Sequence, residues 1–267
     1  MVDIGLELLY NSGVEAIRPS LDGPKAKVMW ADAHFKAFDR ASKRFVKRYS
    51  NSVIFQVDPK TREKVWTFHG VINPLPPEFS LRIGDILYNL RSALDHLVWQ
   101  LVLANRGNPT KVNEFPIYGG PSICDSPRKR FGSEGRKTLS GVGKEAIALI
   151  EGLQPCNCGD LVLMDFDALS NTDKHQHLTL TTIIVAKAFL RGGSLESVAN
   201  LPMQPYFGPL EDNTELLRIP RKYVDMDVDP TIEIGLCCRG NWVSVSQTLS
   251  LMLETVRKTI DKFQHFF

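Results

Sequence analysis

The longest regular hydrophobic pattern in the chain covers Phe79–Asn105. Its apolar residues recur at steps of three and four, which is the period of a helix that buries one face; they are Ile83, Ile86, Leu87, Leu90, Leu94, Leu97, Val98 and Leu101. Ser80 is a suitable N-cap, and Gly107 and the proline that follows it form a C-terminal stop. The pattern therefore predicts a central helix over Ser80–Ala104.

Two stretches towards the ends of the chain have the same helical period. An apolar seam runs through Pro24–Tyr49, and a second one runs through Trp242–Phe267. Shorter amphipathic patterns predict helices at Ser140–Gly152 and Asp160–Ser170. Because an amphipathic helix is stabilised by burying its apolar face, we expect the two terminal helices to pack against the central one.

Other segments have the alternation that is typical of strands. Ser52–Val57 and Lys64–Ile72 flank a turn-forming sequence and predict a β-hairpin. The β-branched run Thr179–Leu190 predicts a further strand, and weaker strands are predicted at Leu216–Ile219, Tyr223–Val228 and Thr231–Cys238. Strands and helices do not alternate regularly, so the predicted fold is one α+β domain over residues 1–267, a helical bundle packed with an antiparallel β-sheet.

Composition limits the classes of function. The formal net charge of +2 gives no overall attraction to nucleic acid, and no apolar run approaches the ~18 residues that would span a membrane. The chain begins with an acidic rather than a basic segment, and its five cysteines, an odd number with one adjacent pair, do not resemble a secreted disulfide framework. These features favour a cytoplasmic protein without a membrane partner.

The central helix carries an unusual set of polar residues. At 100° per residue, Asp85, Asn89, Ser92 and His96 form one stripe. Arg91 and Asp95 are one turn apart on a neighbouring face, where their side chains can pair. A helix this apolar with so many polar groups indicates either a structural polar network or a functional site.

Two resemblances involve these residues. The motifs GDxLxNLRSALDH and NxDKH, with FPI between them, resemble a family of uncharacterised bacterial proteins. The R-x4-H spacing from Arg91 to His96 also resembles the HEPN superfamily of helical bundles, many of which are metal-independent ribonucleases of toxin and phage-defence systems. In those proteins the Arg and His line a cleft, usually across a dimer.

The HEPN resemblance implies catalytic roles for two residues. His96 would be the acid/base, because imidazole titrates near neutral pH, and Arg91 would bind the scissile phosphate. It also implies RNA as the substrate, a homodimer and no cofactor.

A second polar concentration lies at residues 171–177. We expect it to pack beside the turn from Arg91 to His96, because a buried polar group left unpaired costs ~1–3 kcal/mol and the two sets can satisfy each other. Asp173 would accept a hydrogen bond from Arg91 or His96, so Asp173→Ala is expected to destabilise the fold if this polar centre is structural. Whether His96, Asp173, His175 and His177 bind a metal is left open, and the cysteine spacing does not predict a zinc site.

Two functions follow from these patterns. The first is a HEPN-like endoribonuclease of a stress or defence system, with Arg91 and His96 as catalytic residues. The second is a non-catalytic bundle that binds a protein partner or a small molecule, with the Arg/His/Asp cluster as a structural polar network. In either case the supporting residues are Asn89, Asp95, Asn171, Asp173, Lys174 and His175. An exposed Arg91 and His96 in one cleft would favour the first function, and their burial would favour the second.

Overall fold

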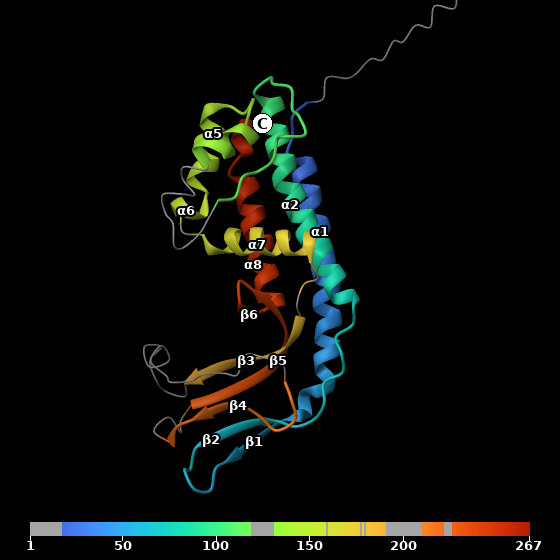
Figure 1. The fold of residues 1–267 in the computed structure, drawn as a ribbon, viewed down its shortest axis with the longest axis vertical. Helices are drawn as coiled ribbons and strands as arrows, with labels where there is room; N and C mark the ends of the chain where they lie inside the picture. The colour runs from blue at the N-terminus through green and yellow to red at the C-terminus, as the bar shows by residue number, and fades with distance from the viewer. Residues whose placement is uncertain are drawn as a thin grey trace, which may run out of the picture.

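The computed structural model describes residues 18–118, 131–158, 160–176, 178, 180–190, 210–221 and 226–267. Three long helices run along the long axis of the molecule, namely α1 (Asp22–Val46), α2 (Glu78–Ala104) and α8 (Val245–Asp261), and α7 (Leu161–His175) lies across them (Figure 1). The strands gather at the end of the molecule opposite the C-terminus. The fold is therefore α+β, as predicted.

The central helix is confirmed in position and burial. Leu90 and Leu94 are both 0% exposed, and α2 contacts α1, α7 and α8. The helix begins at Glu78 rather than Ser80, and the Ser80 hydroxyl donates to the carbonyl oxygen of Pro77 instead of capping the helix. At this end Phe79 packs edge-on against two aromatic rings of α1, those of Phe38 and Phe45.

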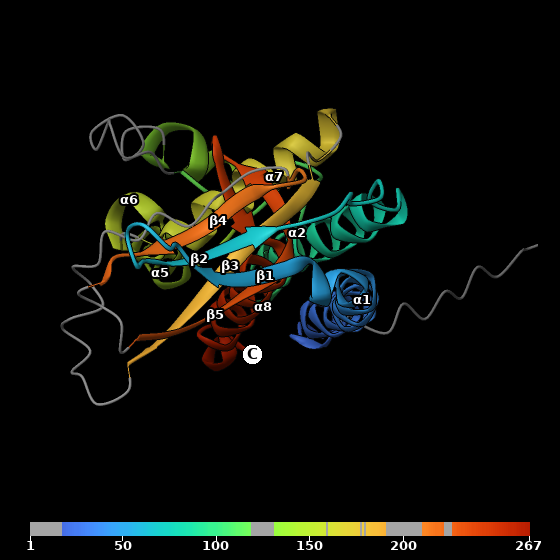
Figure 2. The ribbon, with the colours of Figure 1, turned by 90° about the horizontal axis from the view of Figure 1, so that it is seen from below.

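The strands form two antiparallel sheets of three strands, seen from below in Figure 2. In the first, β1 (Val53–Val57) and β2 (Lys64–Phe68) form the predicted hairpin, and β4 (Thr214–Ile219) adds to β2. In the second, β5 (Met226–Cys238) lies between β3 (Leu180–Leu190) and β6 (Asn241–Ser244). Buried apolar side chains from the helices and from both sheets form one continuous core.

Two predictions in the C-terminal part of the chain were wrong. Two separate strands were expected at Tyr223–Val228 and Thr231–Cys238, but one continuous strand, β5, runs through Pro230. The proline is tolerated because β6 pairs only with the last four residues of β5, so among the described residues Pro230 has a partner strand on one side alone. The last helix begins at Val245 rather than Trp242. Arg239 and Gly240 both have positive φ, which is the geometry of a tight hairpin turn, so the residues after them form β6.

Two shorter helices also differ from prediction. Helix α5 (Lys144–Gly152) begins later than Ser140, because Gly141 has φ +85°, a conformation that no α-helix contains. Helix α7 continues to His175, beyond the predicted end at Ser170. Its first turn is capped by Asp160, whose carboxylate accepts from the Val162 amide at 2.8 Å.

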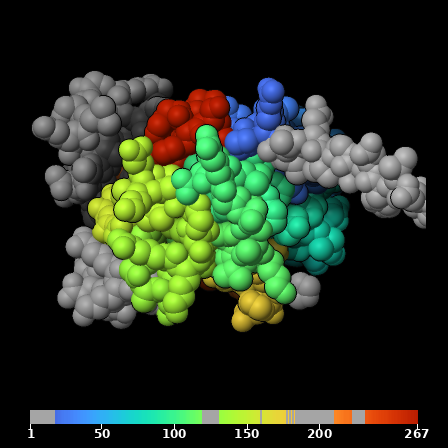
Figure 3. Space-filling model, turned by 90° about the horizontal axis from the view of Figure 1, so that it is seen from above, coloured from blue at the N-terminus to red at the C-terminus, as the bar shows by residue number. Residues whose placement is uncertain are grey.

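The remaining elements are short. They are the 3₁₀ helices η1 (Lys47–Ser52) and η5 (Gln264–Phe266), the π-helical turn η2 (Phe131–Gly135), and the helices α4 (Arg136–Thr138) and α6 (Pro155–Cys158). Seen from above, the segment after α2 packs beside the region of α4 and α5 (Figure 3). In the part of the chain that the structure describes, no helix has the length and apolar character needed to cross a membrane.

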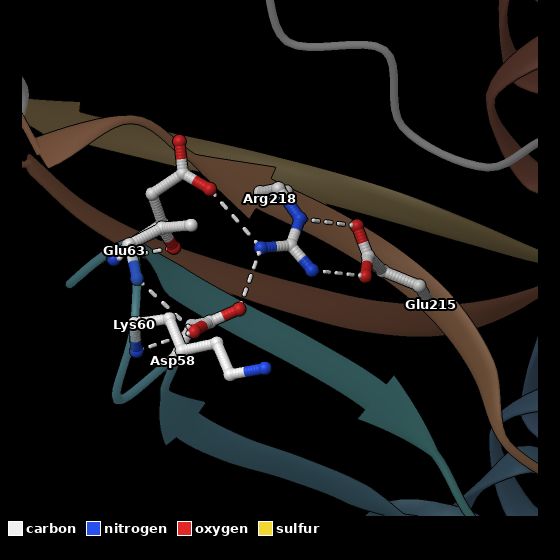
Figure 4. Close-up of polar contacts among 6 residues, drawn as sticks. Asp58, Lys60, Glu63, Glu215 and Arg218 are labelled. Carbon is white, nitrogen blue, oxygen red and sulfur yellow. Dashed lines mark hydrogen bonds and ion pairs between the residues drawn. The ribbon is translucent and has the colours of Figure 1, made fainter.

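A cluster of charges joins the turn of the β1–β2 hairpin to β4 (Figure 4). The Arg218 guanidinium makes a two-pronged contact with Glu215, at 2.8 and 2.7 Å, and reaches Glu63 at 3.0 Å and Asp58 at 3.3 Å. These bonds raise the pKa of Arg218 and lower that of Glu215, whereas the pKa of Asp58 is lowered first by the backbone amides of Lys60 and Thr61. The cluster therefore contributes stability only while the carboxylates are ionised.

Replacing Arg218 with glutamine is expected to lower the melting temperature at pH 7 by a few degrees. Because the carboxyl pKa values are lower in the folded than in the unfolded chain, this stability is present above their ordinary pKa values and is lost as the pH falls through the folded ones. The difference between Arg218→Gln and the wild type should therefore shrink in thermal scans taken towards pH 3. Lys60→Gln, a change in the hairpin turn, is the control and should show no such dependence.

Candidate polar binding site

The extended segment Asn113–Tyr118 is held by side chains rather than by a neighbouring strand. At Phe115, the amide donates to the Asp95 carboxylate at 2.9 Å and the carbonyl oxygen accepts from the Arg91 guanidinium at 2.7 Å. Asn113 fixes the start of the segment by donating to the carbonyl oxygens of Thr138 and Ser140, both at 2.9 Å. Helix α2 thus satisfies the amide and the carbonyl oxygen of Phe115 within a stretch of irregular backbone.

Gln154 holds the other end of this segment. Its side chain is 0% exposed; the amide nitrogen donates to the carbonyl oxygens of Pro116 (2.9 Å) and Ile150 (3.1 Å), and the amide oxygen accepts from the Tyr118 amide at 2.9 Å. A buried side-chain amide has two donors, and both are used here. Sequence reasoning missed Gln154, because nothing in its local sequence shows which backbone it faces.

The predicted pairing of Arg91 with Asp95 is confirmed. Their nearest charged atoms are 3.3 Å apart, and the Arg91 side chain is only 14% exposed. Glu114 lies 3.9 Å from the same guanidinium nitrogen. Three acceptors therefore surround one nitrogen of Arg91, so its positive charge is already paired with groups of the protein.

A cavity of about 470 Å³ lies between the Asn113–Tyr118 segment and α7, and is called the α2–α7 pocket below. Most of its lining is polar; the lining residues are Arg91, Glu114, Pro116, Ile117, Tyr118, Glu134, Asp167, Ser170, Asn171 and Lys174. The pocket brings together three of the residues that the sequence singled out, Arg91, Asn171 and Lys174. The predicted meeting of the two polar segments is thus found for these residues.

The wall formed by α7 is a polar stripe that the sequence analysis missed. Asp167, Ser170, Asn171 and Lys174 follow one another at steps of three, one and three, which places them on one face of a helix. This helical spacing could have predicted the polar face. The sequence did not lead to it because the predicted helix ends at Ser170, which places Asp167 and Lys174 in different segments.

Two groups in the pocket are incompletely satisfied. Burial raises the pKa of the Asp167 carboxyl above its ordinary value, an effect that the charges of Arg91 and Lys174 oppose. The Asn171 amide donates to this carboxylate at 3.2 Å. Ser170 is 6% exposed, and its hydroxyl has no hydrogen-bond partner in the described part of the chain. A buried hydroxyl of this kind is destabilising unless a partner satisfies it.

Asp173 lies elsewhere. It packs against Gly84 of α2, so closely that a methyl group at Gly84 would lie 2.7 Å from a carboxylate oxygen of Asp173. Gly84 precedes His96 by twelve residues, which is about 18 Å along a helix, and the expected hydrogen bonds to Asp173 from Arg91 or His96 are not formed. The physical reason is that Gly84 has no side chain, so Asp173 of α7 can pack directly on α2 at this point.

Asp173→Asn is therefore expected to stabilise the protein at neutral pH, against the sequence-based expectation for Asp173→Ala. Burial, reinforced by the charge of Asp85, raises the pKa of Asp173, so its contribution to stability is fully present below the ordinary pKa and is lost as the pH rises through the folded one. Melting temperatures at pH 3 and pH 7 test this. A lower melting temperature for Asp173→Asn at pH 7 would show that the carboxylate has a cationic partner.

The other predicted residues do not join the pocket. His96 is exposed and faces the start of α1, with its Nδ1 atom 3.8 Å from the position of a methyl group on Gly23. Five residues of helix separate it from Arg91, a rotation of about 140°. Asn89 is buried, and its amide donates within α2 to the Asp85 carbonyl oxygen at 2.7 Å. His175 is exposed in the last turn of α7, whereas His177 lies outside the described residues.

Metal ligands are not grouped in this site. Across the described ranges, no three His, Cys, Asp or Glu side chains come close enough to hold a metal ion. Comparison of the chain with protein-family models, with curated proteins and with solved structures finds no match. The chemistry of the site therefore rests on its own geometry.

Proposed function

We propose that this protein is a non-catalytic α+β bundle that binds a small polar molecule in the α2–α7 pocket. The observation that supports the proposal is that some polar residues bond to the protein backbone, whereas others line the cavity. Arg91, Asp95 and Gln154 are used to hold the backbone of the Asn113–Tyr118 segment. Asp167 keeps acceptor capacity beyond its bond from Asn171, and it lines a cavity whose volume is in the usual range for small-ligand sites.

The geometry gives less support to the ribonuclease function expected from the HEPN resemblance. Cleavage by an acid/base histidine and a phosphate-binding arginine requires both to reach the same phosphate. Here the described contacts of Arg91 are with Asp95, Glu114 and Phe115, and His96 faces α1.

Ligand binding can be tested by thermal shift with a panel of small amines, polyols, carboxylates and nucleosides at pH 7. A ligand of the folded state raises the melting temperature. We expect at least one class to do so in the wild type, and Asp167→Asn to abolish the rise. Asp173→Asn is the matched control, since it removes another carboxylate of raised pKa from the same helix but outside the pocket. No rise with any class would contradict the proposal.

The ribonuclease function has its own test. Purified wild type and His96→Ala are incubated with structured and single-stranded RNA, and their melting temperatures are compared. We expect no cleavage by either protein. Cleavage by the wild type that disappears in His96→Ala, with an unchanged melting temperature, would show that the protein is a ribonuclease and contradict the non-catalytic binding function. Arg91 cannot serve in this comparison, because its replacement is expected to disturb the fold.

A further inference from the structure

Strand β1 is an edge strand in the part of the chain that the structure describes. Its sheet has the order β1-β2-β4, so β1 pairs with β2 on one side alone, and it lies at the end of the molecule opposite the C-terminus (Figure 1). Ile54, Phe55 and Val57 are 46%, 50% and 47% exposed. An exposed apolar edge of this kind is a template on which another strand can add.

The hydrogen bonds at the two ends of β1 show which of its main-chain groups face outwards. The Ser52 carbonyl oxygen accepts from the His69 amide at 2.7 Å, and the Asp58 amide donates to the Glu63 carbonyl oxygen at 2.9 Å. Because successive residues of an antiparallel strand direct these groups to alternate sides, the even-numbered residues bond towards β2. The groups that point to the open edge belong to Val53, Phe55 and Val57.

The three outward residues form a pattern that is its own complement. Val53 and Val57 are identical and flank Phe55 symmetrically. When two copies of β1 pair antiparallel about a two-fold axis at Phe55, each Phe55 meets the Phe55 of the second copy, and each Val53 meets a Val57. Every outward amide and carbonyl oxygen then has a partner, because opposite residues of this kind exchange both hydrogen bonds.

The same register extends an aromatic contact within the hairpin. The ring centroids of Phe55 and Trp66 are 5.0 Å apart. Residues directly opposite each other in antiparallel strands have Cβ atoms about 4.5–5.5 Å apart, so the two Phe55 rings would be neighbours across the axis. A row of aromatic rings would then continue from one copy into the other.

The distribution of charge also favours this pairing. No residue of β1 is charged, so two copies of the strand meet without repulsion between like charges, whereas β4 at the other end of the sheet carries Glu215 and Arg218. Charged side chains on an edge strand are a usual means of preventing strand addition. Because a two-fold contact uses the same edge on both copies, it closes at the dimer.

The size of the contact determines its strength. Stable dimers bury about 1,200–2,000 Å². A five-residue strand with half-exposed side chains supplies less, because even a fully buried phenylalanine contributes only about 150–250 Å². The pairing is therefore expected to be weak and to form at high protein concentration.

We propose that the protein forms a two-fold dimer through β1, in which the β1-β2-β4 sheets of two copies join into one continuous antiparallel sheet centred on Phe55. The partner is a second copy of this chain, because β1 matches itself in main-chain donors and acceptors, in side-chain pattern and in the absence of charge. This interface is independent of the α2–α7 pocket and goes beyond the proposed binding function.

Sedimentation velocity of the full chain at roughly 5–500 µM protein tests the dimer. We expect the wild type to pass from monomer to dimer over this range. Phe55→Lys and Phe55→Glu should each weaken dimerisation at least about tenfold, since like charges then face each other at the axis. An equimolar mixture of the two variants should restore it, because opposite charges then meet in the same register.

Two further variants complete the design. Val71→Glu is the control, since Val71 is an 82% exposed apolar residue outside β1, and it should leave dimerisation unchanged. Val57→Pro keeps the contact of Phe55 with Trp66 and removes an outward amide but no bond to β2, so it should also weaken the dimer. Circular dichroism shows which variants are folded, and Val57→Pro decides the matter if the Phe55 variants are not.

Three outcomes would overturn the proposal. A wild type that stays monomeric at every concentration would do so, and the edge would then be open to a strand from a different protein. A dimer that persists unchanged in the folded β1 variants would show that another face is used. Failure of the mixed Phe55 variants to dimerise, although each is folded, would exclude the two-fold register at Phe55.

Discussion

Replacing Arg91 with methionine is expected to lower the free energy of unfolding by about 3 kcal/mol. The substitution keeps an apolar stem of similar length but removes the donor to the Phe115 carbonyl and leaves the Asp95 carboxylate, which is partly buried, without its cation. Urea denaturation followed by circular dichroism measures the change. The midpoint should fall while the slope stays constant, because the extent of unfolding is the same.

Arg82→Met on the same helix provides the matched control. Arg82 makes no hydrogen bond or ion pair within the described ranges, so its replacement should change stability by no more than about 0.5 kcal/mol. Equal losses in the two variants would show that Arg91 stabilises the helix rather than the Asn113–Tyr118 segment.

Gln154→Leu is expected to have an effect of similar size, about 3 kcal/mol. Leucine fills much of the same volume but removes the hydrogen bonds that Gln154 makes to the Pro116 carbonyl and the Tyr118 amide, and the loss of a bond to a buried group costs about 1–3 kcal/mol. Hydrogen exchange gives the direct measurement, because the Tyr118 amide should lose its protection. Binding of ligands in the α2–α7 pocket should weaken in the same variant, since Tyr118 forms part of its wall.

Gln247→Leu controls for the change of residue type. Gln247 is exposed at the start of α8, where its backbone amide rather than its side chain bonds to Ser244. Exchange at Tyr118 should be unaffected in this variant. If Gln154→Leu leaves the Tyr118 amide protected, the segment is held by its packed side chains and the hydrogen bonds from Gln154 contribute little.

The sequence predicted what periodicity and local spacing determine. The apolar repeat of α2 gave its position, its burial and the pairing of Arg91 with Asp95 one turn later. It did not predict that Gln154 bonds to the Asn113–Tyr118 segment, because the two are distant in sequence and a glutamine amide is compatible with any backbone it meets. The addition of β4 to the hairpin was unpredictable for the same reason.

The candidate site was predicted in outline and misjudged in detail. The polar segments around Arg91 and Asn171 do meet, but through the helical face that begins at Asp167. Asp173 was expected in the same centre because it belongs to the polar concentration at residues 171–177, whereas neighbouring residues on a helix point about 100° apart. The packing of Asp173 on Gly84 follows from the crossing of α7 over α2, which no local pattern encodes.

The Asn113–Tyr118 segment is anchored through its main chain, so the side chains that it presents to the pocket can change while these anchors remain. Arg91, Asp95 and Gln154 bond to its main-chain atoms, which are the same whatever side chains the segment carries. Glu114 and Tyr118 can therefore be exchanged for other residues without removing these anchors. Libraries randomised at these two positions should retain folded members at high frequency, and in them the preference of the pocket for one ligand over another becomes an independently adjustable property.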